Sequence, residues 1–262
     1  MLGRGGSVYG LAMTNPEPVR RVALIADGSF FVGPALARVL AARGHDLAIA
    51  HPLDGLVEEL EALGSTVAVI DAPRDLADPA SAPALVAGAL DRFGRIDAAC
   101  AFSGQIVIGR FTDSTVDDLH AVTRGCIEAP YHFLRAVVPA MVAAGTGQVL
   151  MLTSAAGARP TPGAPLYSAA RAAANMLVKN VAGEVARTGV QVNALGTNFM
   201  DFPEFRRANG ADDPDVRAKI ESRVPMRRLG TVEECASMCA AFLDGTSGFT
   251  TGQFLGYAGG WV

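Results

Sequence analysis

Short apolar runs alternate with amphipathic helical patterns along nearly the whole chain, and this alternation constrains the fold more than any other feature. Runs predicted as strands cover residues 21–26, 45–51, 66–70, 96–101, 148–153, 190–195 and 253–257. Helical patterns lie between them at residues 33–43, 56–63, 83–93, 116–143, 166–187 and 231–242. Strands that alternate with helices form a parallel sheet covered on both faces. We therefore predict an α/β fold with a doubly wound parallel sheet of about seven strands.

The length of 262 residues is compatible with one large domain. No repeat or linker divides the chain, so we predict a single Rossmann-like catalytic domain over residues 20–262. Residues 1–19 are rich in Gly and Pro, and we predict a flexible tail there. The apolar patch in this tail is too short for a secretory signal peptide.

Composition excludes several classes of function. A net charge of −4 gives no reason to expect a nucleic-acid partner, and no apolar run approaches the ~20 residues of a membrane span. The four histidines lack metal-ligand spacing, so no metal site is expected. The four cysteines form no Cys-x-x-Cys pair and are expected to be core thiols in a reducing, cytoplasmic compartment. They are Cys100, Cys126, Cys235 and Cys239.

The stretch from Ser154 to Arg171 holds the candidate catalytic residues. Ser154 follows the predicted strand at 148–153, and the carboxyl ends of such strands are where ligands bind in open α/β sheets. A Gly/Pro-rich loop follows, and then a helix on which Tyr167 and Arg171 are four residues apart and share a face. A fixed cation one turn away favours the phenolate form of a tyrosine. Ser154 can donate a hydrogen bond to the substrate oxygen whose proton Tyr167 removes.

A strand-end serine, a loop and a Tyr-x-x-x-(Lys/Arg) helix resemble the short-chain dehydrogenase/reductase superfamily over nearly the whole chain after residue 20. Most members carry Lys where this chain has Arg171. The Ser154, Tyr167 and Arg171 set looks like that of the halohydrin dehalogenases, a related family without a nicotinamide cofactor. Family members are commonly homotetramers, so the resemblance implies a homotetramer here.

The turn after the first strand supports the same resemblance. The superfamily pattern is T-G-x-x-x-G-x-G, whereas residues 26–33 are A-D-G-S-F-F-V-G. Only Gly33 matches a glycine position, and Asp27 and Phe31 occupy the other two. A carboxylate and a phenyl ring there are expected to repel and exclude a pyrophosphate. We therefore expect no NAD or NADP cofactor.

The resemblance then implies a cofactor-independent carbon–halide lyase. Tyr167 would take the proton of a vicinal halohydrin, and the alkoxide would displace the halide and close an epoxide. The reverse reaction would open an epoxide with a small anion such as halide, azide, cyanide or nitrite. By register, the halide-binding residues would be Phe31, Thr197, Asn198, Phe199 and Met200.

Two other readings of the sequence remain open. The first is an NAD(P)-dependent short-chain oxidoreductase with an atypical cofactor turn. The second is a non-catalytic binding protein on this fold. The altered glycine turn separates the dehalogenase from the oxidoreductase, and the intact Ser154, Tyr167 and Arg171 set separates it from the binding protein.

Overall fold

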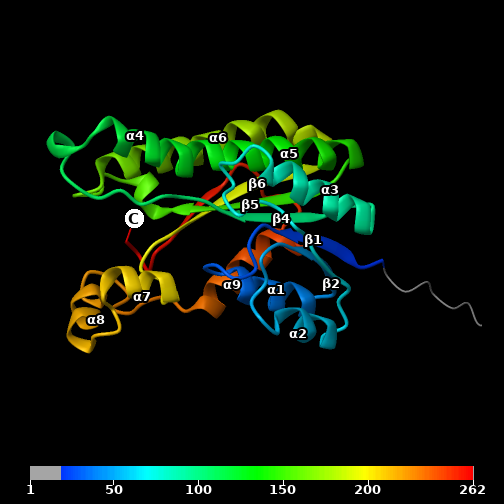
Figure 1. The fold of residues 1–262 in the computed structure, drawn as a ribbon, viewed down its shortest axis with the longest axis horizontal. Helices are drawn as coiled ribbons and strands as arrows, with labels where there is room; N and C mark the ends of the chain where they lie inside the picture. The colour runs from blue at the N-terminus through cyan, green and yellow to red at the C-terminus, as the bar shows by residue number, and fades with distance from the viewer. Residues whose placement is uncertain (1–18, 262) are drawn as a thin grey trace, which may run out of the picture.

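The computed structural model describes residues 19–261, so nearly all of the predicted tail at 1–19 lies outside the described residues. The described chain forms a seven-stranded sheet in the order β3-β2-β1-β4-β5-β6-β7, with every neighbouring pair parallel (Figure 1). The predicted α/β class is therefore confirmed. The strands are β1 (Arg21–Ile25), β2 (His45–Ile49), β3 (Val67–Val69), β4 (Ala98–Phe102), β5 (Gly147–Ser154), β6 (Val190–Thr197) and β7 (Phe254–Tyr257).

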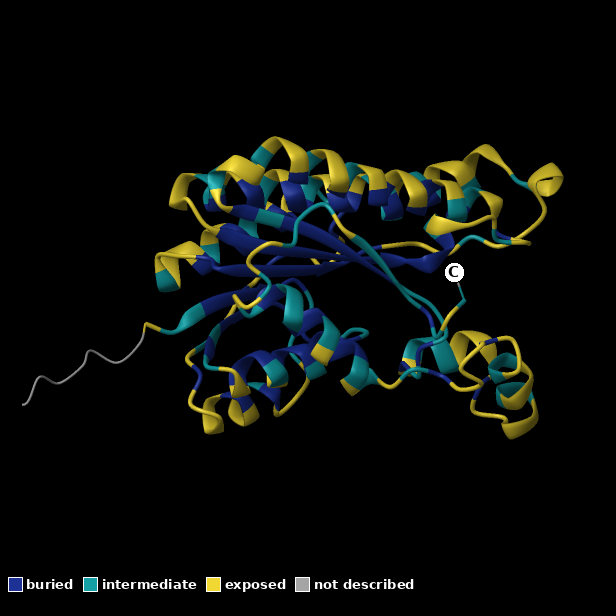
Figure 2. Cartoon of the chain, turned by 180° about the vertical axis from the view of Figure 1, so that it is seen from behind, coloured by how far each residue is buried: buried dark blue, intermediate teal, exposed yellow. Residues whose placement is uncertain are grey.

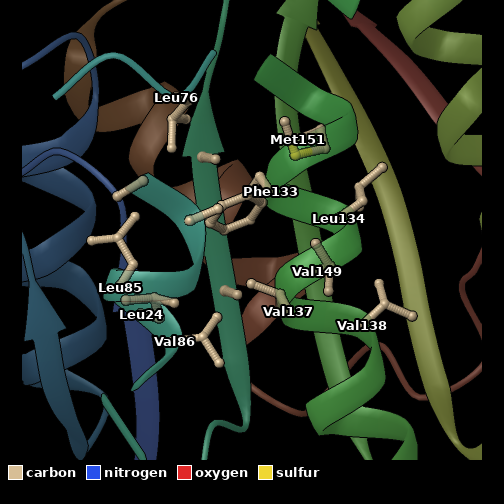
Figure 3. Packing of buried hydrophobic residues seen from close by; sticks show 14 of the residues in the cluster. Leu24, Leu76, Leu85, Val86, Phe133, Leu134, Val137, Val138, Val149 and Met151 are labelled. Carbon is tan, nitrogen blue, oxygen red and sulfur yellow. The ribbon is translucent and has the colours of Figure 1, made fainter. Parts of the chain in front are cut away.

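Helices cover both faces of the sheet, and Figure 2 shows their outer surfaces exposed over a buried sheet. One face is covered by α3 (Ser81–Phe93), α5 (Ala129–Ala144) and α6 (Pro165–Val185). The other is covered by α1 (Gly33–Ala42), α2 (Leu56–Ala62) and α9 (Val232–Leu243). In Figure 3, Phe133 of α5 lies among the buried side chains of β5 and α3, where each such large apolar residue contributes about 1.5–3 kcal/mol by burial.

The long helix predicted over residues 116–143 is interrupted, so that prediction was wrong in this detail. The structure has α4 (Val116–Thr123), a π-helical turn at Arg124–Glu128, and then α5. Pro130 lacks the N–H that a regular helix would use to bond the carbonyl four residues earlier, which weakens the α ladder at this point. The wider turn places Gly125 against the backbone of Gln105, where an added Cβ would lie 2.6 Å from the amide nitrogen.

The predicted excursion at residues 198–226 contains two short helices, α7 (Pro203–Asn209) and α8 (Pro214–Glu221). In Figure 1 they project beyond the carboxyl ends of the strands, on the side of the sheet that carries α1 and α9. Asp201 ties them together, because its carboxylate lies 3.3 Å from Arg206 on α7 and 3.0 Å from Arg217 on α8. These contacts hold the pair of helices beside the edge where ligands bind in this fold.

The strand order reverses between β1 and β4. The chain runs outward from β1 through β2 to β3, then crosses back to β4 and continues to β7. The chain therefore leaves β1 and β4 in opposite directions along the sheet, and a crevice opens between the carboxyl ends of these two strands. Such a switch point is where open α/β sheets bind their ligands. Among residues 19–261, no helix is both long enough and apolar enough to cross a bilayer.

Candidate active site

Ser154 is the last residue of β5 and lies in the sheet beside Thr197, the last residue of β6. Its side chain is buried, and its Oγ accepts a hydrogen bond of 3.1 Å from the N–H of Ala156. That bond begins a short 3₁₀ turn and fixes the rotamer of the serine. Because the Oγ accepts this bond, its hydroxyl hydrogen is left to donate to a ligand.

Tyr167 lies in the first turn of α6 and is 8% exposed. It packs in a small cluster with Ala156 from the turn after β5 and Val122 from α4. The neighbouring Ser168 fastens the start of the helix to the same turn, donating at 2.6 Å to the carbonyl of Ala156 and at 2.9 Å to that of Arg159. The structure thus anchors Ser154 and Tyr167 to one short backbone segment.

Arg171 is only 4% exposed and forms no ion pair within the described residues. Its guanidinium donates to the Oγ of Ser103 at 3.2 Å and also to the Ser103 carbonyl. The Cζ atom lies 5.1 Å from the centre of the Tyr167 ring, and Nε has no partner within residues 19–261. A buried cation without a carboxylate is costly unless it serves an anion that forms or binds nearby.

Gly104 leaves the space that this guanidinium fills. Its φ of +134° is a conformation that L side chains rarely adopt, and an added Cβ would overlap the Nη2 atom of Arg171. Ser103 and Gly104 were not among the predicted site residues. The signal that could have found them is a glycine two residues after a fully buried strand, at an edge where ligands bind.

The first turn keeps a glycine-like backbone course despite its altered sequence. Phe31 has a φ of +47°, the left-handed conformation that glycine normally supplies. An added Cβ at Gly33 would overlap the carbonyl oxygen of Asp27, so glycine is required there. The Asp27 carboxylate accepts from the Ser29 N–H at 2.9 Å and from Arg74 Nε at 2.8 Å. Its charge is therefore balanced by a cation, which reduces its repulsion of an anion.

A cavity of about 520 Å³ lies at the switch point. Residues from the ends of β1 and β4, the first turn, the loop after β3 and the π-helical turn line it, among them Arg74 and Arg124. Its volume falls within the range of about 300–1,000 Å³ usual for small-molecule sites. The size of the cavity and the retained course of the turn fit a dinucleotide, and each arginine in the lining is paired with a carboxylate of the same lining, Asp27 or Asp75.

Three of the five predicted halide residues line one cavity. Asn198, Phe199 and Met200 line a cavity of about 270 Å³ beside α9 and β7, and Phe31 is not among its lining residues. Phe199 packs edge-on against Trp261 at 5.4 Å between ring centres. Phe31 instead packs against Phe30 and Phe202, with ring centres 4.0 and 5.4 Å away. Thr197 lies within the sheet, between Ser154 and Tyr257.

Comparison with known proteins identifies the class to which this fold and site belong. A family model described as enoyl-(acyl carrier protein) reductase matches residues 31–262. The chain belongs to this family, within the short-chain dehydrogenases/reductases. Oxidoreductase UcpA of Salmonella typhimurium is 30% identical, over 88% of this chain and 90% of that protein.

Solved structures support the same placement. A structure described as a dehalogenation enzyme is 27% identical with a TM-score of 0.81, covering 93% of this chain and 98% of that one. Levodione reductase is 25% identical with a TM-score of 0.80, covering 92% and 96%. The structure of ElxO with NADP bound, at 20% identity and a TM-score of 0.81, shares the fold.

These findings correct two linked expectations. The cofactor-independent carbon–halide lyase and the absence of NAD and NADP are contradicted, because the matching family, UcpA, a D-beta-hydroxybutyrate dehydrogenase and levodione reductase are oxidoreductases. The halide-binding role of Phe31 and residues 197–200 was implied by that activity and loses its basis with it. The physical error lay in treating Asp27 and Phe31 as isolated side chains. In the structure Arg74 pairs with the carboxylate, and the phenylalanine adopts the backbone conformation of the glycine it replaces.

Proposed function

We propose that this protein is an NAD(P)-dependent oxidoreductase that interconverts an alcohol and a carbonyl compound. The observation that carries the proposal is the buried Arg171 guanidinium, which has no carboxylate partner among the described residues and lies over the ring of Tyr167. This arrangement sits beside a switch-point cavity with two arginines in its lining. The membership of the oxidoreductase family supports the same chemistry.

Each residue then has a defined task. The Ser154 hydroxyl donates a hydrogen bond to the substrate oxygen and holds it against Tyr167. The Tyr167 hydroxyl gives a proton to that oxygen during reduction and takes one from it during oxidation. Arg171 stabilises the negative charge that the ring carries after the proton has left. Its bonds to Ser103 keep the guanidinium in place during this change.

The dinucleotide would be held by the first turn (residues 26–33), by residues 102–105 after β4, and by the arginines of the cavity. When bound, its nicotinamide supplies or accepts the hydride. The protein's own contribution is to bind and orient the two reactants and to move the proton at the Tyr167 hydroxyl. The carboxyl end of β5 brings Ser154 to the same edge of the sheet as this cavity.

The test combines turnover with binding. Wild-type protein is assayed with NADH and NADPH against a panel of simple ketones, and Tyr167→Phe is compared with Tyr131→Phe, an exposed tyrosine on α5. We expect Tyr167→Phe to lose about 10²–10⁴-fold in turnover, and both variants to bind the dinucleotide like the wild type. Absence of both dinucleotide binding and nicotinamide-dependent turnover in the wild type would refute the proposal.

We further propose a cytoplasmic homotetramer. The thiols of the four cysteines are free and buried, which suits a reducing compartment. Large apolar side chains are exposed after β4 and near the C-terminus, including Ile108 at 78% and Phe249 at 104%. Ile106, Ile108 and Phe111 are all exposed in the segment after β4, and a group of exposed apolar side chains is typical of a surface that another subunit covers. Light scattering coupled to size exclusion tests the assembly, and a monomer at micromolar concentration would contradict it.

A further inference from the structure

Arg74 reaches into the switch-point cavity from the loop after β3 and is held there by the first turn. Its Nε donates to Asp27 at 2.8 Å, and its Nη2 donates to the Oγ of Ser29 at 2.6 Å. The side chain is 56% exposed, and Nη1 makes no hydrogen bond within the described residues. The guanidinium is thus fixed on one edge and open on the other.

The start of α1 supplies few donors of its own to an anion. The N–H of Gly33 already bonds to the carbonyl of Phe30 at 2.9 Å, and Pro34 has no N–H. In a nucleotide-binding turn the free amides of this first helical turn normally face the phosphates. A phosphate at this helix therefore needs a further positive partner, and Arg74 lines the same cavity as Asp27 and Phe30.

The loop that carries Arg74 is also fastened on its other side. The next residue, Asp75, accepts from Arg124 of the π-helical turn at 2.7 Å. Adjacent residues of opposite charge thus pair with opposite walls of one cavity: Arg74 with the first turn and Asp75 with the helical layer. These two pairs keep the Arg74 guanidinium at the cavity in the free protein.

We propose that Arg74 is a phosphate-binding residue of this site, and that Asp27 positions it while weakening its attraction for the phosphate. The ligand is a dinucleotide, so the inference rests on the proposed function. Arg74 offers its open Nη1 edge to a phosphate oxygen, which accepts a charge-assisted hydrogen bond. The Asp27 carboxylate holds the other edge, and its negative charge opposes the phosphate.

The test measures affinity rather than turnover. NADH and NADPH are titrated by nicotinamide fluorescence into wild type, Arg74→Gln and Asp27→Asn. Arg74→Gln removes the cation, so we expect affinity to fall about fivefold, the size of an exposed charge pair. Asp27→Asn keeps Oδ1, which accepts from Ser29 and from Arg74 Nη2, and replaces the Oδ2 that accepts from Nε. It removes the negative charge, so we expect affinity to rise by about the same factor. Both effects should shrink as salt is added.

The two dinucleotides identify the phosphate. An equal loss for NADH and NADPH in Arg74→Gln assigns the pyrophosphate, and a loss confined to NADPH assigns the phosphate on the ribose. Arg38→Gln and Glu59→Gln are the controls, because they remove the same charges from an exposed pair on α1 and α2. These control variants should bind like the wild type.

Failure of the inference can be distinguished from failure of the proposed function. Tight dinucleotide binding that Arg74→Gln leaves unchanged, or that Asp27→Asn weakens, would overturn the role of Arg74 and leave the oxidoreductase standing. Inorganic pyrophosphate, titrated by calorimetry, is the second probe. If neither dinucleotide binds but pyrophosphate does so in an Arg74-dependent way, the phosphate site stands and the oxidoreductase falls. If wild type binds none of the three, both are wrong.

Discussion

Substitution of Gly104 by alanine should disable the site by displacing Arg171. The residue has a φ of +134°, and holding alanine in such a conformation costs about 1–3 kcal/mol. The new Cβ would also overlap the guanidinium, which is buried. Losing one of its charge-assisted bonds to Ser103 costs about 1.5–3 kcal/mol more. We therefore expect Gly104→Ala to lose about 2.5–6 kcal/mol of unfolding free energy.

Gly109→Ala separates the two contributions. Gly109 has a φ of +152°, but an added Cβ would meet no atom within 4 Å, so it introduces backbone strain without a clash. Urea unfolding should show Gly104→Ala to be about 2 kcal/mol less stable than Gly109→Ala. Turnover should fall at least tenfold further in Gly104→Ala, because Arg171 no longer lies over Tyr167. Equal stability and equal turnover of the two variants would refute the inference that Gly104 is needed to make room for the guanidinium of Arg171.

Three further outcomes follow from buried or paired groups. Burial lowers the pKa of His45, and the charge of Arg21 lowers it further. In acid, His45 is therefore protonated in the unfolded chain at pH values where it is still neutral in the folded chain. Stability should fall as pH drops below about 6.5, and urea midpoints of His45→Gln should fall less; an equal slope would contradict this. Hydrogen bonds from Arg228 and the Thr231 backbone lower the pKa of Glu234 from 4.5 to about 2. That contribution is complete above pH 4.5 and disappears as pH falls towards 2, so Glu234→Gln should flatten the acid limb of a thermal-unfolding profile. Burial raises the pKa of the Cys100 thiol, so an aromatic disulfide reagent should label it only on unfolding, and rapid labelling of native protein would argue against its place in the core.

Periodicity predicted most of the fold because parallel strands buried on both faces leave an unambiguous pattern. The β5 strand is buried at every position, and it was predicted to within two residues at either end. The one clear error in the helices is at the turn before Pro130. The apolar residues on each side of a π-helical turn still show a helical pattern, although the hydrogen bonds between them change. Composition and spacing do not record that change.

The positions of the candidate catalytic residues were predictable, whereas the ligand of the site was not. Ser154, Tyr167 and Arg171 lie at fixed spacings on two consecutive elements, so local reasoning places them on the strand end and the helix where the structure has them. The cofactor turn depends on Arg74, which is 47 residues from Asp27 in sequence. A local sequence pattern cannot predict that a residue so distant in sequence will neutralise the charge of Asp27. The same applies to Gly104, whose purpose becomes visible only when Arg171 is seen to fill the space above it.

The π-helical turn at Arg124–Glu128 also changes how this protein must be aligned and engineered. A π turn accommodates one residue more than the α-helical turn it replaces. Counting helical positions backwards from α5 into α4 therefore misplaces every residue before the turn by one. Deleting a single residue between 124 and 128 would let the ladder close as a regular helix while α4 and α5 keep their present orientations relative to one another. Phe133, which is fully buried here, would then keep its place in the core, so this segment should tolerate the loss of one residue far better than the regular turns of α5.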